Sequence, residues 1–171
     1  MCRCFYYWGE GQLYNDCEWV LAEEEPDPST WVDLNSGLYM DVERVSHNDG
    51  ARIHQWTYTG AAKQWWGMRT SGCGCGPGFV NSTSANSGKC LGVQDGSLGQ
   101  GAPILQRGCN RHPGQTWLWV YTGSTTSTGW PIWNILDEHS GMCLGTSGAS
   151  TSVGAYAIQW GCNGNADQAW Y

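Results

Sequence analysis

Short apolar stretches separated by turns rich in Gly and Ser recur along most of the chain. In the middle of the sequence this pattern predicts strands at Lys89–Val93, Ala102–Gln106 and Gln115–Trp119, with a turn over Gln94–Gly101 between the first two. A further strand is predicted before each of three such units, at Trp31–Leu34, Phe79–Ser82 and Trp133–Leu136.

The units are internal repeats. Three segments align without a gap, namely Ser36–Trp66, Ser87–Trp117 and Ser140–Trp170, so length differences fall only in the connections 67–86 and 118–139. About four strands per repeat, and about twelve in all, favour a closed antiparallel structure, because one repeat alone cannot bury its apolar face. Eight columns are identical in all three segments, and in the first they are Ser36, Gly37, Ser46, Gly50, Ala51, Gln55, Gln64 and Trp66.

Cysteines occupy the same two columns in two of the repeats. Cys90 and Cys109 are 19 positions apart, and so are Cys143 and Cys162. This matched spacing predicts two disulfides, each within its own repeat.

In the first repeat the same two columns hold Tyr39 and Tyr58. Both cysteines are absent together, as expected if the two side chains touch. We therefore expect an aromatic contact to replace the disulfide in this repeat.

Five further cysteines lie outside the repeats, and they allow two interpretations. Two Cys-x-Cys pairs would ligate zinc if they came together. Disulfides between the N-terminal segment and the connection 67–86 are the alternative, and the odd number then leaves one thiol unpaired or bonded to another chain. These cysteines are Cys2, Cys4, Cys17, Cys73 and Cys75.

Composition narrows the class of protein. The 12 Trp, 8 Tyr and 25 Gly are typical of many short strands and tight turns, so low helix content is expected. The net charge of −7, without any Lys/Arg cluster, argues against a nucleic-acid partner. Nine cysteines indicate an oxidising compartment, and hence a secreted or cell-surface protein. No apolar run approaches the ~20 residues of a membrane span.

The first 30 residues lie outside the repeats. They combine cysteines and aromatic residues with an acidic stretch, 23–28, that is predicted to be a solvated connector. We expect the aromatic part to pack on the repeat domain or on a neighbouring chain, which makes self-association or a partner chain an expectation for residues 1–30. The domain itself is predicted over 31–171, with repeats at about 31–78, 79–130 and 131–171.

Each repeat ends in a Gln-x-Trp motif in register with the paired cysteines. From about residue 31 to 171 the chain resembles ricin B-type lectins and family-thirteen carbohydrate-binding modules. The resemblance implies an all-β fold, a β-trefoil in which three lobes surround a pseudo-threefold axis, each with one shallow potential sugar site. The motifs are Gln64-Trp65-Trp66, Gln115-Thr116-Trp117 and Gln168-Ala169-Trp170.

A shallow sugar site needs an acceptor for hydroxyl protons and an aromatic face for stacking. The resemblance assigns these roles in the first repeat to Asp41 and Trp56, with His54, Lys63 and Gln64 completing the site. Lys63 stands where the family usually has Asn. Taken singly, Asp41 is equally explained as a turn cap and Trp56 as an edge cover, whereas their joint presence favours a site.

The other repeats depart from the pattern. The third keeps an aromatic residue, Trp160, and Gln168, but has Gly145 in place of the carboxylate, with Asp167 as a substitute from the other side. The second has lost both the carboxylate and the aromatic residue and is predicted not to bind. Trp66, Trp117 and Trp170 are predicted to be core residues, and Gln64, Gln115 and Gln168 to have a scaffold role as well.

The residues therefore predict a carbohydrate-binding lectin or module that binds glycan mainly through the first repeat. The alternative is a structural or assembly subunit whose sugar sites have decayed. An enzyme is not expected, since no pair of acids stands out for glycoside hydrolysis. No cofactor and no metal are expected.

Overall fold

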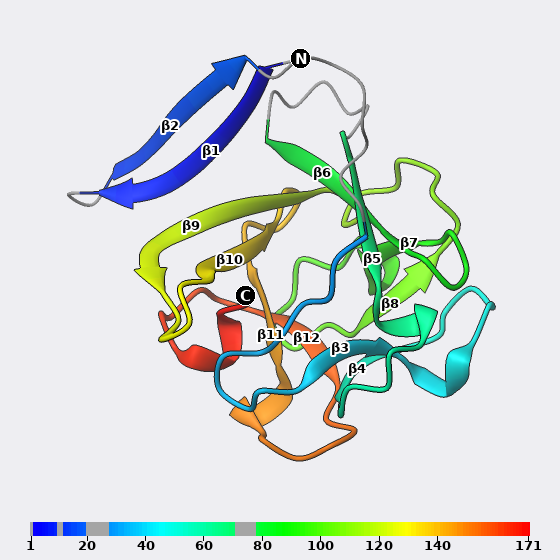
Figure 1. The fold of residues 1–171 in the computed structure, drawn as a ribbon. Coiled ribbons are helices and arrows are strands. Elements are labelled where there is room, and N and C mark those ends of the chain that lie inside the picture. The colour runs from blue at the N-terminus through cyan, green and yellow to red at the C-terminus, as the bar shows by residue number, and fades with distance from the viewer. Residues whose placement is uncertain (1, 10–11, 20–27, 71–77) are drawn as a thin grey trace.

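The computed structural model of the protein describes residues 2–9, 12–19, 28–70 and 78–171, and side chains from residue 28 onwards apart from residue 70 (Figure 1). These residues form β-strands and short 3₁₀ turns, without an α-helix. The repeat domain contains the strands β3 (Tyr39–Val42), β4 (Ile53–Trp56), β5 (Trp66–Thr70), β6 (Phe79–Ser84), β7 (Cys90–Val93), β8 (Ile104–Arg107), β9 (Trp117–Thr125), β10 (Pro131–Asp137), β11 (Cys143–Thr146) and β12 (Ala157–Trp160).

Six segments close into a barrel. β5 pairs with β6, β6 with β9, and β9 with β10, all antiparallel. Single bridges complete the ring, joining Ser29 to Trp66 and connecting Trp170 with both Trp133 and Asp33. The strand predicted at Trp31–Leu34 and the last strand of the third repeat, at Trp170, are thus both reduced to bridging residues, which is why the repeat domain has ten strands rather than twelve. Closure by these bridges removes the open edges that would attract other strands.

Three hairpins, β3–β4, β7–β8 and β11–β12, cover one end of the barrel. Each hairpin contacts the other two through one bridge, Arg52 to Leu105, His54 to Tyr156, and Pro103 to Ile158. The barrel and the hairpin triplet together form the β-trefoil, and the three repeats are its lobes.

The end of each repeat lies in the core. Trp66, Trp117 and Trp170 are at most 1% exposed, which confirms their predicted core role. Each indole Nε1 donates to a backbone carbonyl 26 residues earlier, on Met40, Leu91 or Leu144. The three indoles thereby fasten each barrel strand to the hairpin of its own lobe without leaving a buried donor unpaired.

A second glutamine column joins the lobes to one another. Gln106 accepts from Ser87 of its own lobe, while its Nε2 donates to the carbonyls of Ser46 and Asn48 in the first lobe. Gln159 makes the same contacts from the third lobe to the second, and Gln55 from the first to the third. The identical Ser36, Ser46 and Gln55 columns therefore build a closed cycle of contacts between lobes.

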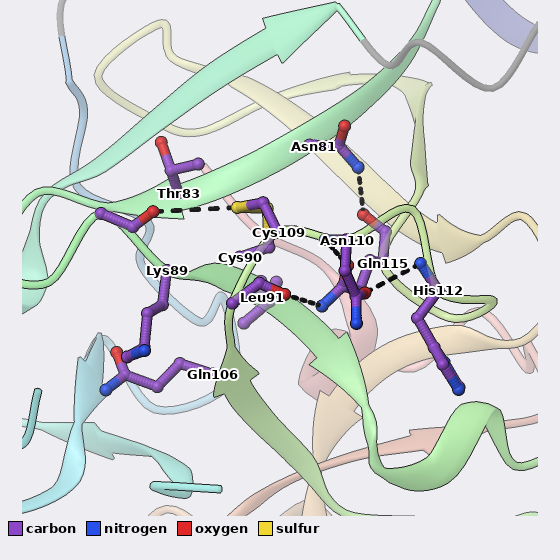
Figure 2. Close-up of a disulfide and its surroundings, with 12 residues drawn as sticks. Asn81, Thr83, Lys89, Cys90, Leu91, Gln106, Cys109, Asn110, His112 and Gln115 are labelled. Carbon is purple, nitrogen blue, oxygen red and sulfur yellow. Dashed lines mark hydrogen bonds between the residues drawn. A yellow bond between two sulfur atoms is a disulfide. The ribbon is translucent and has the colours of Figure 1, made fainter. Parts of the chain in front are cut away.

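The predicted disulfides Cys90–Cys109 and Cys143–Cys162 are present, each with a Cα–Cα distance of 5.1 Å (Figure 2). In the first lobe the rings of Tyr39 and Tyr58 are 4.8 Å apart, so the aromatic contact in these columns is also confirmed.

The N-terminal segment forms a hairpin of β1 (Cys2–Gly9) and β2 (Gln12–Trp19). β1 also pairs in parallel with β9, through Tyr6 with Val120 and Tyr7 with Tyr121, and the hairpin projects beside the trefoil (Figure 1). The backbone pairing places this hairpin beside the repeat domain, whereas the predicted packing of its aromatic side chains lies outside the described side chains. The acidic stretch 23–28 lies, except for Pro28, outside the described residues. Over the described residues, no helix has the length and apolarity to cross a membrane.

Candidate functional site

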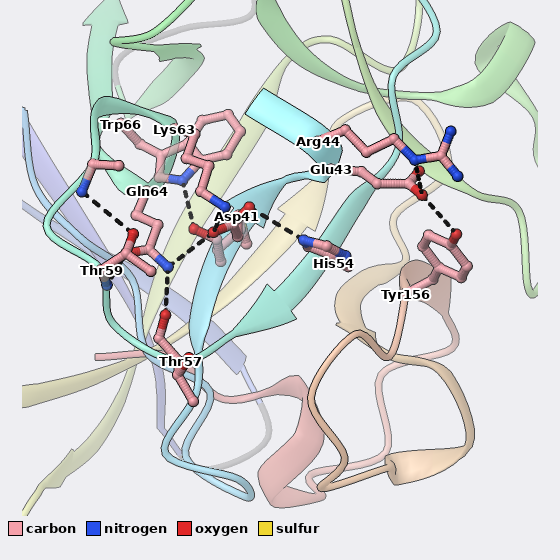
Figure 3. Close-up of polar contacts among 12 residues, drawn as sticks. Asp41, Glu43, Arg44, His54, Thr57, Thr59, Lys63, Gln64, Trp66 and Tyr156 are labelled. Carbon is pink, nitrogen blue, oxygen red and sulfur yellow. Dashed lines mark hydrogen bonds and ion pairs between the residues drawn. The ribbon is translucent and has the colours of Figure 1, made fainter. Parts of the chain in front are cut away.

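Asp41 lies at the centre of the polar cluster of the first lobe (Figure 3). It sits on β3 opposite His54 of β4, and its side chain is fully buried. Its Oδ1 lies 3.1 Å from His54 Nε2, and its Oδ2 accepts from Gln64 Nε2 at 2.9 Å and lies 3.1 Å from Lys63 Nζ. The sequence-predicted residues are thus brought together, but the carboxylate faces its own neighbours rather than solvent.

Gln64 has a scaffold role that recurs in every lobe. Its Oε1 accepts from the backbone N–H of Thr59, and its Nε2 donates to the carbonyl of Thr57. Gln115 and Gln168 close the equivalent loops with the same two types of bond. Only Gln64 also donates to a carboxylate, so the scaffold role explains the column and the Asp41 contact is particular to this lobe.

Trp56 ends β4 and is 36% exposed. The His54 ring stacks against it at 5.1 Å with an interplanar angle of 20°, and Lys63 Nζ lies 5.9 Å from its ring centroid. A Cβ on Gly154 of the third lobe would lie 3.4 Å from the indole, and the φ of +87° at Gly154 is a second reason for glycine there. The exposed Trp56 indole, the aromatic platform of the first lobe, therefore lies at a junction between two lobes.

An open pocket of about 430 Å³ surrounds this platform. Besides Trp56, His54 and Lys63, its lining includes Tyr156 of the third lobe, whose hydroxyl donates to Glu43 at 3.2 Å. Figure 3 shows Tyr156 beside Glu43 and Arg44. Four lining residues were not among the predicted site residues. Gly154 and Tyr156 belong to the third lobe and were missed because the sequence prediction treated each repeat as a separate site. Glu43 and Arg44 belong to the first repeat but lie outside the columns to which the resemblance assigns a role.

The second lobe lacks a comparable site. Arg107 replaces the aromatic residue and its guanidinium lies 3.7 Å from Asp95. At Gly92, in the carboxylate column, a Cβ would lie 3.1 Å from Gln115 Cγ and 3.3 Å from the carbonyl of Gly114. In the second lobe, Gln115 and Gly114 therefore take up the space that a carboxylate side chain at position 92 would need.

The third lobe keeps an exposed platform, Trp160, at the end of β12. A Cβ on Gly101 of the second lobe would lie 3.6 Å from this indole, an arrangement like that of Trp56 and Gly154. Asp167 lies next to Gln168 and is 9% exposed. The structure thus places Trp160 at the surface of the lobe and Asp167 largely below it.

Two other buried carboxylates belong to the framework. Burial raises the pKa of Asp33 and of Asp137 above the usual range for Asp. Asp33 accepts from Thr146 Oγ1 at 2.6 Å, and the nearby charge of Asp167 also raises its pKa. Asp137 accepts from the backbone N–H of Ser140, but its Oδ1 has no hydrogen-bond partner among the described residues.

The described residues contain no group of three or more His, Cys, Asp or Glu side chains arranged to hold a metal ion. The zinc and disulfide alternatives for the remaining cysteines fall outside the described side chains. The β1–β2 register does place the backbone of Cys4 opposite that of Cys17.

Three lobes, a closed barrel and aromatic platforms at lobe junctions define the class of β-trefoil lectin-like domains. The family model described as ricin-type beta-trefoil lectin domain-like matches residues 16–107 and 114–171, and the chain belongs to this family. The protein is therefore, at the level of the family, a carbohydrate-binding module. The narrower assignment to family-thirteen modules stays a prediction.

Solved structures agree with the fold. The designed threefold symmetric protein ThreeFoil is similar over 82% of this chain and 94% of its own, with 32% identity and a TM-score of 0.75. An exo-β-1,3-galactanase from Clostridium thermocellum is 27% identical with a TM-score of 0.75, over 88% of this chain but only 31% of its own length. The ricin B-like lectin of Macrolepiota procera, solved with lactose, is 17% identical with a TM-score of 0.65, over 88% of this chain and 96% of its own. No curated protein matches the chain in sequence.

Proposed function

We propose that the protein is a lectin that binds glycan mainly through the pocket of the first lobe. The observation that carries the proposal is the exposed indole of Trp56 within an open pocket lined by Lys63, His54 and Tyr156. The indole offers a face to the C–H side of a sugar ring. The Lys63 ammonium has three donor hydrogens, and those not directed at Asp41 can donate to sugar hydroxyls or other acceptors.

Asp41 then acts as a positioning residue. Because it is fully buried and contacts His54, Lys63 and Gln64, it orients these side chains rather than accepting a sugar hydroxyl itself. This differs from the role that the family resemblance assigns to its column. A sugar that reaches the carboxylate directly would have to displace the Lys63 ammonium.

Replacement of Trp56 tests the proposal. Trp56→Ala is expected to weaken glycan binding about tenfold or more, because the stacking surface is removed. Trp130→Ala is the matched control, since Trp130 is 64% exposed and lies between β9 and β10, away from the pocket lining. Binding is measured on a glycan array and then by calorimetry with the best ligand. An array without hits for folded protein would contradict the proposal.

We infer that the chain binds without turnover. Glycoside hydrolysis commonly needs two carboxylates that flank the scissile bond. In the first-lobe pocket Glu43 is engaged by Tyr156 and Arg44, and Asp41 is buried beneath Lys63. Release of reducing sugar from a bound oligosaccharide would overturn this inference.

The two disulfides support a secreted or cell-surface location, because such bonds persist in oxidising compartments. A role as an assembly subunit is the second candidate. Among the described strands β2 pairs only with β1, and its other edge is where this candidate function would add a strand from another chain. Deletion of residues 1–28 would then lower the mass measured by light scattering, whereas an unchanged mass would count against this candidate.

A further inference from the structure

The turn that follows β3 has a strained backbone. In each lobe the equivalent turn holds two consecutive residues with positive φ, and one of the two is Gly96 in the second lobe and Gly148 in the third. In the first lobe both are non-glycine residues, Arg44 with a φ of 56° and Val45 with a φ of 54°. A left-handed conformation is unfavourable for a residue with a Cβ, and most of all for a β-branched one. Strain of this kind is typical of binding sites, so the side chain held there is a candidate for function.

The strained turn places the Arg44 guanidinium in the lining of the first-lobe pocket. Its Nε lies 3.5 Å from Glu43 Oε1, which also accepts from the Tyr156 hydroxyl (Figure 3). The Arg44 side chain is 87% exposed. A guanidinium has five N–H donors, and one carboxylate takes at most two of them in the bidentate arrangement. The other donors of Arg44 therefore remain available to an acceptor that enters from solvent.

Lys63 adds a second cation to the same lining. Its counter-charge Asp41 lies 3.1 Å away and is fully buried, whereas the Lys63 side chain is 13% exposed. Glu43 is 24% exposed and is engaged by Arg44 and by Tyr156. The charged groups that reach the pocket are therefore two cations and one carboxylate that already has partners.

The two cations are particular to the first lobe. Neither column holds a Lys or an Arg in the other lobes, where the residues are Asp95 and Gly114 in the second and Gly148 and Asp167 in the third. The chain as a whole has a net charge of −7, so its overall field disfavours an acidic ligand. A preference for such a ligand must therefore come from Arg44 and Lys63 themselves.

We propose that the first-lobe pocket binds an acidic pyranose, which stacks on Trp56 and directs its anionic group, a carboxylate or a sulfate ester, at Arg44 and Lys63. The proposal rests on the proposed lectin function and names the substrate class of that site. Charge-assisted hydrogen bonds to an oxyanion are stronger than those to a neutral hydroxyl, and the planar guanidinium matches the oxyanion geometry. Arg44 is thereby a specificity-determining residue, and the strained turn serves to present it.

The test uses the whole chain and follows the indole N–H resonance of Trp56 by nuclear magnetic resonance, assigned through Trp56→Ala. Galacturonic acid and glucuronic acid are each compared with their neutral methyl esters, and galactose 6-sulfate is compared with galactose. At least one acid is expected to bind roughly tenfold more tightly than its neutral counterpart. The acid that binds more tightly distinguishes a carboxylate from a sulfate ester. Raising the salt concentration from about 50 to about 500 mM should weaken the binding of the acid and not that of the neutral sugar.

Substitution of Arg44 tests its assigned role. Arg44→Gln is expected to weaken binding of the acid about 3–10-fold and to leave the neutral counterpart unchanged. Arg44→Gly should give the same loss in an intact turn, because Gly148 occupies the same column with a φ of 63°. A merely structural role of Arg44 would weaken both probes alike.

Arg111→Gln is the matched control. Arg111 is exposed, also has a positive φ, of 58°, and lies in the second lobe outside the pocket lining. Its substitution removes the same charge from the same backbone conformation, so the preference for the acid should be unchanged.

The outcomes separate this inference from the proposed function. Equal binding of each acid and its neutral counterpart overturns the acidic substrate class and leaves a first-lobe lectin site standing. A loss in Arg44→Gln no larger than that in Arg111→Gln overturns the role of Arg44. An unchanged Trp56 resonance with every probe also overturns the inference, and the glycan array then decides separately whether the pocket binds another glycan. The comparison of acid with neutral sugar needs no variant, so it holds even if a substitution impairs folding.

Discussion

Asp33 and Asp137 occupy the same column of the repeat, and both carboxylates are buried. The second lobe has Ser84 in this column, also buried, so a neutral residue serves the same position. Since burial raises the pKa of both acids, the folded state holds their protons at a pH where the unfolded chain has released them. The ionised forms therefore subtract from stability at neutral pH.

Asp137→Asn is predicted to relieve part of this effect. Below the unfolded pKa of about 4 both states are protonated, and Asp137 contributes no pH dependence. As the pH rises through the interval up to the folded pKa, the native state loses stability relative to the variant. Urea unfolding at a series of pH values from about 4 to 7 should show the free energy of unfolding of Asp137→Asn rising relative to that of the parent protein. A constant difference across this range would contradict the prediction.

Gln106 joins the second lobe to the first by two donated bonds and accepts one bond from Ser87 of its own lobe. Gln106→Leu keeps the volume but leaves two carbonyls and a hydroxyl without this partner, so we expect a loss of about 2–4 kcal/mol. The measurement is the free energy of unfolding in urea, with Gln94→Leu as the control at an exposed position. A loss no larger than that of the control would show that the lobes are held together by other contacts.

At the level of strands and hairpins, the first lobe differs from the others in its Tyr39–Tyr58 contact. The double substitution Tyr39→Cys and Tyr58→Cys is predicted to form a third disulfide, because the equivalent cysteines have Cα atoms 5.1 Å apart in both other lobes. The crosslink adds about 3 kcal/mol and the lost aromatic contact removes about 0.5–1.5 kcal/mol. The oxidised variant should melt roughly 4–8 °C higher than the parent.

Two controls accompany this variant. Reduction should abolish the gain, and the single substitution Tyr58→Cys should lower the melting temperature because it leaves an unpaired thiol against the Tyr39 ring. If the oxidised double variant melts below the parent, the first lobe does not share the geometry of the other two.

For the whole molecule, the cycle of glutamine contacts means that each lobe depends on both neighbours. We predict one cooperative transition in urea, with coincident curves from Trp fluorescence and far-ultraviolet circular dichroism. The 12 Trp residues place a fluorescent reporter in every lobe. Separate transitions by the two probes would show that the lobes unfold independently.

The hairpin strands could be predicted from the sequence because their pattern repeats three times. The predicted Lys89–Val93 and Ala102–Gln106 correspond to β7 and β8 within two residues. The hairpin β1–β2 could not, since a single occurrence has no repeat to support it. The contribution of Tyr156 to the first-lobe pocket was also missed, because it depends on which lobes are neighbours in space.

The burial of the Asp41 carboxylate could not be predicted from the sequence either, for a different reason. Its column is a site position in the family, but whether its oxygens are available depends on Lys63 and His54, which lie 22 and 13 positions further along the chain. A column-by-column comparison names these residues and says nothing about which of them contact one another. Only the three-dimensional arrangement shows that Lys63 and His54 contact the Asp41 carboxylate and cover it.

Val32 and Tyr171 exchange two backbone hydrogen bonds, which brings residue 171 next to the first segment of the barrel. A short peptide linking residue 171 to the start of the first lobe would therefore span little distance, and new termini could open at the exposed turn 126–129. Such a circular permutant should keep the same barrel and the same lobe junctions. The order in which ribosomes synthesise the lobes is then not what specifies their packing.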